Sequence, residues 1–449
     1  MKATTLFSIL LMFLAISAFA QQQQVLSLKQ AIDLALEKNV NIIQSQNNVE
    51  AAQSRALAAY GNYLPTLSAS GSWNRSQNDQ AGSYTSSQFG STFSIPPSFS
   101  VTNNFSTRLD LSYVLFDGFG REAGFNAAKS SASSSEDRAI RSRQTVTNLV
   151  ENLYHNILRL EQLVKVSEEN LKRDNRQLER ISESNKVGAV ALADVYRQQT
   201  QVATDELNLI TAQNNYDNAK ADLGALIGLD MSSEYQLSDA SISTSIDQSE
   251  LEATRQKYVN VTELSQRAVA ARPDYVAAKN DLNAAESGVT EAKSGYFPTV
   301  AASAGYGMSN NELSRITDNK NLSWGISIRW SVFDAFRTNQ AIQTAVANKK
   351  SAEASLVQSE RDINVQVKKA MLDLEAARKQ VEVSQKGLRS ATEDRKIAEE
   401  RYNLGAGTLL DLLIANAGLV NSQANNINAT YNYIISKRNL EYVIGERAY

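Results

Sequence analysis

The sequence predicts a mixed α+β fold, mostly helical, in which one strand-and-helix unit occurs twice. Three observations support this. Short motifs recur at fixed offsets along the 449 residues. Two pairs of segments alternate apolar with small or polar residues, the period of a β-strand. Two stretches of more than sixty residues lack proline and space their apolar residues as a helix does. Each copy is therefore expected to contain two strands and a long helical hairpin.

The duplication is visible in three pairs of motifs. They are NYLPTL at 62–67 with GYFPTV at 295–300, LFDGF at 115–119 with VFDAF at 332–336, and the glycine turns at Gly188 and Gly405. The first pair is offset by 233 positions and the other two by 217, so one loop is longer in the first copy. The chain is expected to divide into a first repeat at 21–230, an equatorial linker at 231–260 and a second repeat at 261–449.

Residues 1–20 are predicted to be a secretory signal peptide. Lys2 precedes an apolar run from Leu6 to Phe19, and the small-residue pattern before Gln21 is typical of a cleavage site. The chain has no cysteine, which excludes disulfides, zinc-thiolate sites and a cysteine nucleophile. A net charge of −3 gives no basic field for nucleic acid. No later apolar run approaches the ~20 residues of a spanning helix, so an exported chain would meet a membrane only through strands.

Strands are expected at about 64–75, 104–117, 297–309 and 322–334. The fourth is the clearest, because Leu322, Trp324, Ile326, Ile328, Trp330 and Val332 alternate with Ser323, Gly325, Ser327, Arg329 and Ser331. This pattern is typical of transmembrane β-strands. A soluble sheet with one solvated face is the alternative. The three tryptophans, Trp73, Trp324 and Trp330, all lie in these strands, as a barrel aromatic belt requires.

Helical hairpins are expected at 120–228 and 336–445. Their long arms, Arg121–Lys186 and Arg337–Asn403, repeat apolar residues at spacings of three, four and seven, as coiled coils do. At 1.5 Å per residue each arm would span on the order of 100 Å, which no compact domain accommodates. Returning helices are expected at about 192–226 and 409–444.

Four membrane strands cannot close a barrel alone, because a bilayer tolerates no open sheet edge. Two chains would supply eight strands and a filled interior, whereas three would supply twelve strands and a lumen. The same multiplication would turn the helical hairpins into a tube. The sequence thus favours an oligomeric conduit.

These features resemble the TolC family, the outer-membrane channels of tripartite efflux pumps and type I secretion systems. The resemblance rests on the duplication, on Phe116-Asp117 and Phe333-Asp334, and on the turn at 401–412. It implies a homotrimer whose twelve-strand β-barrel is continuous with a twelve-helix α-barrel, in the outer membrane with a long periplasmic extension. It also implies contact with outer-membrane lipid, a periplasmic adaptor (membrane fusion protein), an inner-membrane pump of RND, ABC or MFS type, and a role in multidrug resistance.

The resemblance also implies a pore constriction at the periplasmic tip. Asp411 matches the family's aspartate ring, Tyr402 matches a tyrosine that holds the closed state, and Asp194 matches its partner region. Ile414 and Gly407 stand where the family has an aspartate and an arginine. Asp411 also has a local interpretation, because Thr408 three residues earlier can form a capping box with it.

The two tip turns are expected to contact the adaptor. They comprise Gly188, Ala189, Val190, Gly405, Ala406, Gly407, Thr408 and Leu409. Gly188 and Gly405 are predicted to be left-handed helix caps. Only the second turn has a capping residue, since Ala191 occupies that place in the first, and this asymmetry favours the second turn as the gate.

No catalytic constellation, metal site or cofactor site is predicted, and the chain is not expected to be an enzyme. His155, the only histidine, is expected to be packed or solvated. The glycines at 118–124 superficially match a dinucleotide loop, but the second copy lacks them. The competing function is an exported periplasmic coiled-coil scaffold or adaptor protein without a pore, which would leave the four amphipathic strands unexplained.

Overall fold

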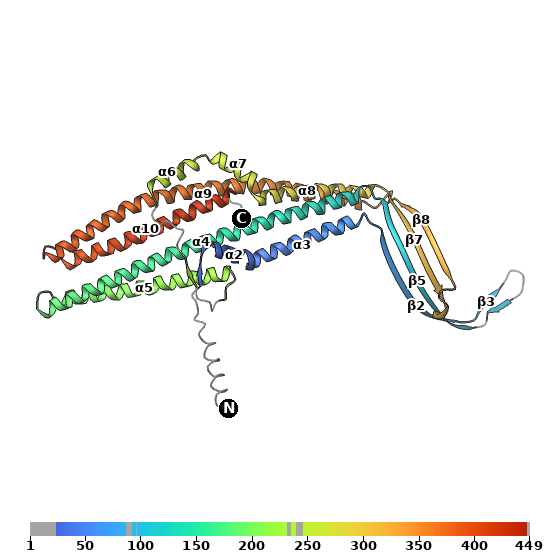
Figure 1. Cartoon of the computed structure of the whole chain (residues 1–449). Coiled ribbons are helices and arrows are strands. Elements are labelled where there is room, and N and C mark those ends of the chain that lie inside the picture. Colours follow the sequence, from blue (N-terminus) through green and yellow to red (C-terminus); the bar gives the residue numbers. More distant parts are fainter. Residues whose placement is uncertain (1–23, 87–91, 96, 231–234, 239–245, 447–449) are drawn as a thin grey trace, which may run out of the picture. The chain divides into compact units, whose positions relative to one another are not determined.

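The structure, a computed structural model, describes residues 24–86, 92–95, 97–230, 235–238 and 246–446 (Figure 1). The expected signal peptide lies outside these residues. The elements are β1 (Gln24–Leu26), α2 (Leu28–Lys38), α3 (Val40–Gly61), β2 (Thr66–Gln80), β3 (Ser83–Ser86), β4 (Thr92–Ile95), β5 (Ser98–Phe116), α4 (Gly120–Lys186), α5 (Leu192–Leu226), β6 (Tyr235–Leu237), α6 (Gln248–Lys257), α7 (Val261–Ala271), α8 (Pro273–Lys293), η2 (Ser294–Tyr296), β7 (Thr299–Asn310), η3 (Leu313–Arg315), β8 (Lys320–Arg329), α9 (Arg337–Asn403) and α10 (Leu409–Val443).

These elements form two compact units. The helical unit holds the chain up to Asn47 together with Asp137–Val276 and Val357 onward, and the sheet unit holds Asn48–Glu136 and Ala277–Leu356. Each repeat contributes to both units, because its strands lie in the sheet unit and its helical hairpin extends through the helical unit.

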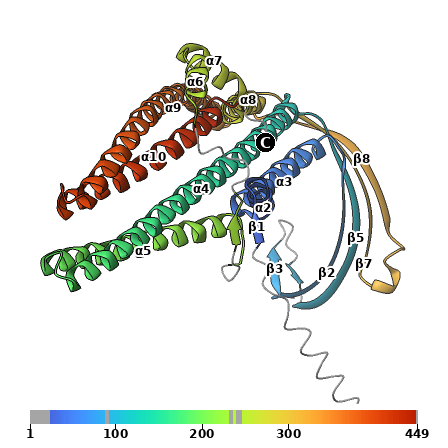
Figure 2. The same ribbon diagram turned by 60° about the vertical axis from the view of Figure 1, so that its left-hand side comes forward.

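The sheet unit is built on four antiparallel strands in the order β2-β5-β7-β8. Figure 2 shows them curving side by side. Strands β2 and β5 come from the first repeat and β7 and β8 from the second, so the β5–β7 pairing joins the two copies within one sheet. Strands β2 and β8 are the edges, and neither has a further strand beside it in the described chain.

The pairing register gives this sheet two chemically distinct faces. Directly paired residues share a face, and the register aligns Leu67 with Leu111, Leu111 with Ala304, and Ala304 with Trp324. The apolar face also carries Ala69, Trp73, Phe105, Leu109, Tyr113, Tyr306, Leu322 and Ile326. The opposite face carries Ser68, Ser70, Ser72, Ser106, Arg108, Asp110, Ser112, Ser303, Gly305, Ser323 and Gly325. The predicted alternation is therefore confirmed.

The strand ends differ from those expected. Strands β2 and β5 pair from Thr66–Ser112 out to Gln80–Ser98, so both extend beyond the expected strand ends at about 75 and 104. The β3–β4 hairpin lies between them in the sequence. Serine, asparagine and glutamine dominate these strand extensions and conceal their period. Strand β8, in contrast, ends at Arg329 rather than near residue 334. The chain soon enters a left-handed corner at Ala335 and Phe336, with φ of 54° and 66°, which a ladder cannot include.

That corner explains the repeated Phe-Asp motif. In the first copy the Asp117 Oδ2 atom accepts a hydrogen bond from the Arg121 amide at 2.9 Å. In the second copy the Asp334 Oδ2 atom accepts one from the Thr338 amide at 2.7 Å. Each aspartate thus satisfies an amide in the first turn of its long helix. The flanking rings are edge-to-face with centroids 5.7 Å apart in both Phe116–Phe119 and Phe333–Phe336.

The helical unit contains the two predicted hairpins, in which α5 folds back along α4 and α10 along α9 (Figure 1). The long helices have 67 residues each and the returning helices 35 each, so the duplication extends to element length. The buried apolar clusters also match across the repeats at the 217-residue offset. The matched pairs include Val150 with Val367, Leu223 with Leu440, and Ile227 with Ile444.

The helical segment that precedes the first strand of the sheet consists of two helices, α2 and α3. Asn39 is extended, with ψ of 128°, and separates α2 from α3. Its side-chain amide donates to the Leu226 carbonyl at 3.0 Å, which fixes the break against the end of α5. Arg272 does the same in the second copy, where its Nη1 atom donates to the Val443 carbonyl at 3.4 Å. Repeat-equivalent positions thus hold equivalent helix ends with different side chains.

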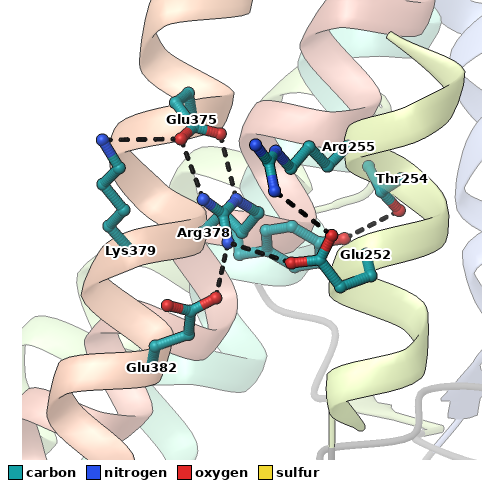
Figure 3. A network of polar contacts seen from close by, with 8 residues as sticks. Glu252, Thr254, Arg255, Glu375, Arg378, Lys379 and Glu382 are labelled. Carbon is teal, nitrogen blue, oxygen red and sulfur yellow. Dashed lines mark hydrogen bonds and ion pairs between the residues drawn. The ribbon is translucent and has the colours of Figure 1, made fainter. Parts of the chain in front are cut away.

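The expected linker at 231–260 contains regular structure. Strand β6 pairs in parallel with β1, and α6 lies against α9 through Arg378 (Figure 3). The Arg378 side chain is 9 % exposed and donates to both carboxylate oxygens of Glu375, at 2.8 and 2.9 Å. It also pairs with Glu382 on α9 and, at 3.9 Å, with Glu252 on α6. The hydrogen bonds that Arg378 donates to Glu375 are the main cause that lowers the pKa of Glu375 to about 2.

Candidate functional site

Both hairpin turns are closed by the same backbone hydrogen bonds. At the first, the Gly188 amide donates to the Asn185 carbonyl and the Ala189 amide to the Ser184 carbonyl, both at 2.9 Å. At the second, the equivalent bonds run from Gly405 to Tyr402 at 3.1 Å and from Ala406 to Arg401 at 2.8 Å. This pattern is the Schellman motif, which needs a left-handed residue. Gly188 and Gly405 supply it with φ of 76° and 72°, as predicted.

The start of the returning helix differs between the turns. The Thr408 hydroxyl accepts from the Asp411 amide at 3.2 Å, and the Asp411 carboxylate accepts from the Thr408 amide at 3.0 Å. This is the predicted capping box, and its hydrogen bonds from the Thr408 amide and hydroxyl lower the pKa of Asp411. At the first turn Ala191 has the extended backbone of a cap but no side chain that can bond.

The three residues expected at the constriction are only partly brought together. Tyr402 lies near Asp194, and burial together with the negative charge of Asp194 raises the pKa of Tyr402. Asp194 also forms an ion pair with Arg197 at 3.0 Å. The carboxylate of Asp411 is instead exposed and bonded within its own turn.

A small apolar cluster joins the two tips. Ile181 from α4, Val195 from α5 and Leu409 from α10 are buried against one another, with Val190 and Tyr402 packed beside them. Leu409, expected to contact the adaptor, is only 4 % exposed in the single chain. Its side chain packs one hairpin against the other, and docking by its side chain would require the tips to separate.

The most exposed apolar residues at the tips were missed from the sequence. Val187 and Leu404 are 80 % and 83 % exposed and occupy equivalent positions, each directly before its glycine. Leu192, Leu410 and Ile414 are also exposed. The sequence contains a signal for this exposure, because an apolar residue between the end of a helix and a turn glycine has no core to enter. We refer to Val187 and Leu404 as the tip pair.

Replacing Ala191 by serine is expected to stabilise the first hairpin by about 1 kcal/mol. The Asp194 amide donates to the Ala191 carbonyl at 3.0 Å, and a serine hydroxyl would add the side-chain acceptor that Ala191 lacks, as the Thr408 hydroxyl does for the Asp411 amide. The reciprocal change, Thr408→Ala, is expected to destabilise the second hairpin by a similar amount. Amide hydrogen exchange at residues 192–195 and 409–412 measures both effects. Equal exchange in the variant and the parent would contradict the capping argument.

In the sheet unit the three tryptophans lie at different heights. Trp73 pairs with Phe105, which pairs with Asn310 at one end of β7. Trp324 pairs with Ala304 in the middle of that strand. Trp330 follows Arg329, which pairs with Thr299 at the other end. Trp73 and Trp330 therefore mark opposite ends of β7 rather than a single ring.

The polar face of the sheet holds one charge pair. The Arg108 Nε atom donates to the Asp110 carboxylate at 2.6 Å. Gly305, on the neighbouring strand, leaves room for it, since a Cβ there would lie 2.8 Å from Arg108 and 2.9 Å from Asp110. A residue of the second repeat thus accommodates charges of the first.

Potential metal ligands are scattered among the described residues. None of them form a group of three or more histidine or acidic side chains able to hold a metal. His155 is buried beside Tyr154, the two rings being 6.3 Å apart and edge-to-face. Within the same part of the chain, no helix combines the length and apolarity needed to cross a membrane.

The sheet has an apolar face, and its strands are joined in sequence to long helical hairpins. This combination is typical of proteins whose strands contact lipid and whose helices lie in water. Comparison with known sequences assigns the family. The chain belongs to the outer membrane efflux protein family, which it matches over residues 31–229 and 264–446. It is accordingly an outer-membrane efflux channel protein with a long periplasmic helical extension.

Similar proteins agree with this assignment. The outer membrane protein TolC of Salmonella enteritidis is 22 % identical over 77 % of this chain and 70 % of its own. The probable efflux pump outer membrane protein TtgC of Pseudomonas putida is 25 % identical over 93 % and 83 %. Among solved structures, the Campylobacter jejuni CmeC outer membrane channel has a TM-score of 0.77 at 20 % identity, covering 93 % of this chain and 85 % of CmeC.

Proposed function

We propose that three copies of this chain form the exit duct of a tripartite efflux pump. The duct conducts substrates from the periplasmic helical tips through the outer membrane. The observation that carries the proposal is the four-stranded sheet with an apolar face and two open edges. Such edges cannot remain unpaired in lipid. Efflux is favoured over type I secretion because TtgC, similar along nearly the whole chain, is named as part of an efflux pump.

The trimer follows from closing those edges. Strand β8 of one copy would pair with β2 of the next, and three copies of four strands give a twelve-stranded barrel. The apolar face would meet lipid. The serine- and glycine-rich face, with Arg108 and Asp110, would line the lumen.

The tryptophan heights support a membrane position for the sheet. The 12 residues of β7 separate the levels of Trp73 and Trp330, or about 40 Å along a strand. A strand tilted by about 45° would bring this to roughly 28 Å across the membrane. That separation matches the ~30 Å hydrocarbon core, so Trp73 and Trp330 would belong to two aromatic belts and Trp324 would face the acyl chains.

Cysteine pairs test the closure, because the natural chain contains no cysteine. Ser323→Cys on β8 is combined in turn with a cysteine at one polar-face position of β2, namely Ser68, Ser70, Ser72 or Asn74. Oxidation of outer membranes is expected to link chains covalently into trimers for at least one pair. Ser106→Cys on the inner strand β5, combined with Ser323→Cys, is the control and should not link chains. A freely soluble periplasmic monomer that forms no linked trimer would reject the channel.

At the tip we propose that Asp411, with Tyr402 and Asp194, shapes the constriction and its cation preference. Three exposed carboxylates around a threefold axis would concentrate a negative potential. Asp411→Asn is expected to reduce cation-over-anion selectivity several-fold in planar bilayers. Because the asparagine oxygen can still accept from Thr408, the helix cap is retained. Unchanged conductance and selectivity would remove Asp411 from the constriction.

The exposed tip residues, including the tip pair, Ala189, Ala406 and Thr408, would meet the periplasmic adaptor, and the adaptor would connect the duct to an inner-membrane pump of RND, ABC or MFS type. This part of the proposal is supported by the exposure of Val187 and Leu404 at matched positions.

A further inference from the structure

A charged groove lies between α4 and α9, away from the tip turns in sequence. Its volume is about 770 Å³ and its lining consists entirely of charged side chains. Five are cations and three are carboxylates, namely Lys172, Arg173, Arg176, Arg180 and Arg395 with Glu169, Glu179 and Glu399. We call it the arginine groove. Its lining carries an excess of positive charge inside a single helical unit.

Arg173 on α4 and Arg395 on α9 both line this groove. Burial is the main cause that lowers the pKa of Arg173 on α4, and the positive charge of Arg395 on α9 lowers it further. The Nε atoms of Arg173 and Arg395 are both buried, and neither has a hydrogen-bond partner among the described residues. A buried guanidinium N–H without an acceptor is costly, and two guanidiniums of like charge add repulsion.

The other groups in the groove do little to neutralise these cations. On α4, the Arg173 Nη2 atom donates to the amide oxygen of Asn170, the Arg176 Nε atom to the Lys172 carbonyl at 3.3 Å, and the Arg180 Nη2 atom to the amide oxygen of Gln177. All three acceptors are neutral. The carboxylate of Glu399 is bonded to Arg395 along the same helix. The charges of Asp174, Asp205 and Glu169 act on Arg173 but leave its Nε atom unpartnered.

We propose that the arginine groove binds a tetrahedral oxyanion, a phosphate or sulfate group, between Arg173 and Arg395. Such an anion offers several acceptor oxygens in a geometry that suits guanidinium groups from opposite sides. It would accept from the guanidinium groups of both arginines and replace repulsion between them by attraction to a shared charge. The group can arrive as a free ion or as the phosphate of a small solute.

The second repeat has no equivalent groove lining, which supplies a control. At the 217-residue offset, Ser390 and Ile397 stand where the first repeat has Arg173 and Arg180. Lys172 corresponds to Arg389, an exposed cation on α9 that does not line the groove. Arg389→Gln therefore removes the same charge as a groove variant without touching the proposed site.

Thermal unfolding of the detergent-purified full assembly tests the proposal, with sodium sulfate compared to sodium chloride at equal ionic strength. Sulfate is expected to raise the Tm of the parent and of Arg389→Gln, and to have little effect beyond chloride on Arg395→Gln or Arg173→Gln. Without sulfate, Arg395→Gln should be at least as stable as the parent, because it removes repulsion. A merely structural arginine would instead leave a less stable variant that still responds to sulfate.

Calorimetric titration gives the affinity and the source of the anion. Inorganic phosphate is expected to bind once per chain, and Arg395→Gln should weaken its Kd at least tenfold. Glycerol 3-phosphate is titrated in the same way. If it binds as tightly as inorganic phosphate, the site is open to phosphorylated solutes; if it does not bind, the site admits only the free ion. Equal phosphate affinity in the parent and in both groove variants, or no binding above that of chloride, would overturn the proposal.

Discussion

Replacing Asp174 by asparagine is expected to raise the free energy of unfolding at pH 8, on the order of a few kcal/mol. Asp174 on α4 is 1 % exposed and hydrogen-bonded to Asp205 on α5, which is 3 % exposed. Burial, then the hydrogen bond with Asp205 and its negative charge, raises the pKa of Asp174 from 3.8 to about 7. Each pKa unit corresponds to about 1.4 kcal/mol between the two protonation states.

The direction of the pH dependence follows from this raised pKa. Between pH 4 and pH 7 the folded chain retains the proton on Asp174 while the unfolded chain has lost it. The stability that the neutral carboxyl provides is therefore fully present below about pH 4 and is lost as the pH rises through about 7. Asparagine stays neutral, and its amide can donate to Asp205. The gain in the free energy of unfolding from Asp174→Asn should therefore be less than half as large at pH 5 as at pH 8.

Denaturant midpoints of the parent and of Asp174→Asn, measured from pH 5 to pH 9, check this result. Asp394→Asn is the matched control, because Asp394 is an exposed carboxylate on α9. The charged neighbours of Asp174 are Arg173 on its own helix, Asp205 on α5 and Arg395 on α9 near Arg173, so chloride buffers without sulfate or phosphate are required. If the parent and Asp174→Asn lost stability with the same pH slope, Asp174 would not be the group that titrates.

Two differences between the repeats, a buried carboxyl pair and a missing helix cap, weaken the first hairpin relative to the second. At the positions equivalent to Asp174 and Asp205 the second hairpin has Ala391 and Ser422, which bury no carboxyl group. Its returning helix is capped by Thr408, whereas the first has Ala191. The sequence asymmetry pointed to the second turn as the gate, because that turn carries the exposed Asp411. From the missing cap and the buried carboxyl pair we expect the first hairpin to open more easily than the second, particularly above pH 7.

The sequence specified the long helices better than any other feature. Proline-free stretches bounded by a Phe-Asp corner and a glycine leave little choice of helix end, and α9 begins and ends at the expected Arg337 and Asn403. The break at Asn39 was missed because neither glycine nor proline marks it. Its equivalent in the second repeat, Arg272, precedes Pro273, which disfavours a helical backbone at the residue before it. Because the two repeats are equivalent, the helix end that Pro273 marks in the second repeat predicts a helix end at Asn39 in the first.

The candidate sites were less predictable because they depend on packing between helices that are distant in sequence. The capping box of Thr408 and Asp411 is local, and its residues could be read directly. The burial of Leu409 depends on Ile181 and Val195 of the other hairpin. The meeting of Asp174 with Asp205, and of Arg173 with Arg395, depends on the rotation of each helix, which a seven-residue pattern sets only approximately. Charged residues at such positions look like a solvated face until the neighbouring helix is placed.

Changing both members of the tip pair to glutamate is expected to reduce adaptor cross-linking at least tenfold and to abolish efflux. Val187 and Leu404 have little packing to lose, since they are 80 % and 83 % exposed. Burying one such side chain against a partner contributes about 1.5–3 kcal/mol. A buried, unpaired glutamate would instead oppose docking. Three copies around the tip would present six such positions in the proposed trimer.

The introduced cysteine Ala406→Cys, unique in this cysteine-free chain, provides the cross-linking site in living cells. Val187→Glu, Leu404→Glu and the double variant are each compared with Leu207→Glu, which replaces an apolar residue that is 65 % exposed in the middle of α5. The control should cross-link and export as the parent does, and the double variant should still form outer-membrane trimers. Because the glutamates enter no core, loss of cross-linking with intact trimers would assign the tip pair to the adaptor interface. Undiminished cross-linking in the double variant would exclude it.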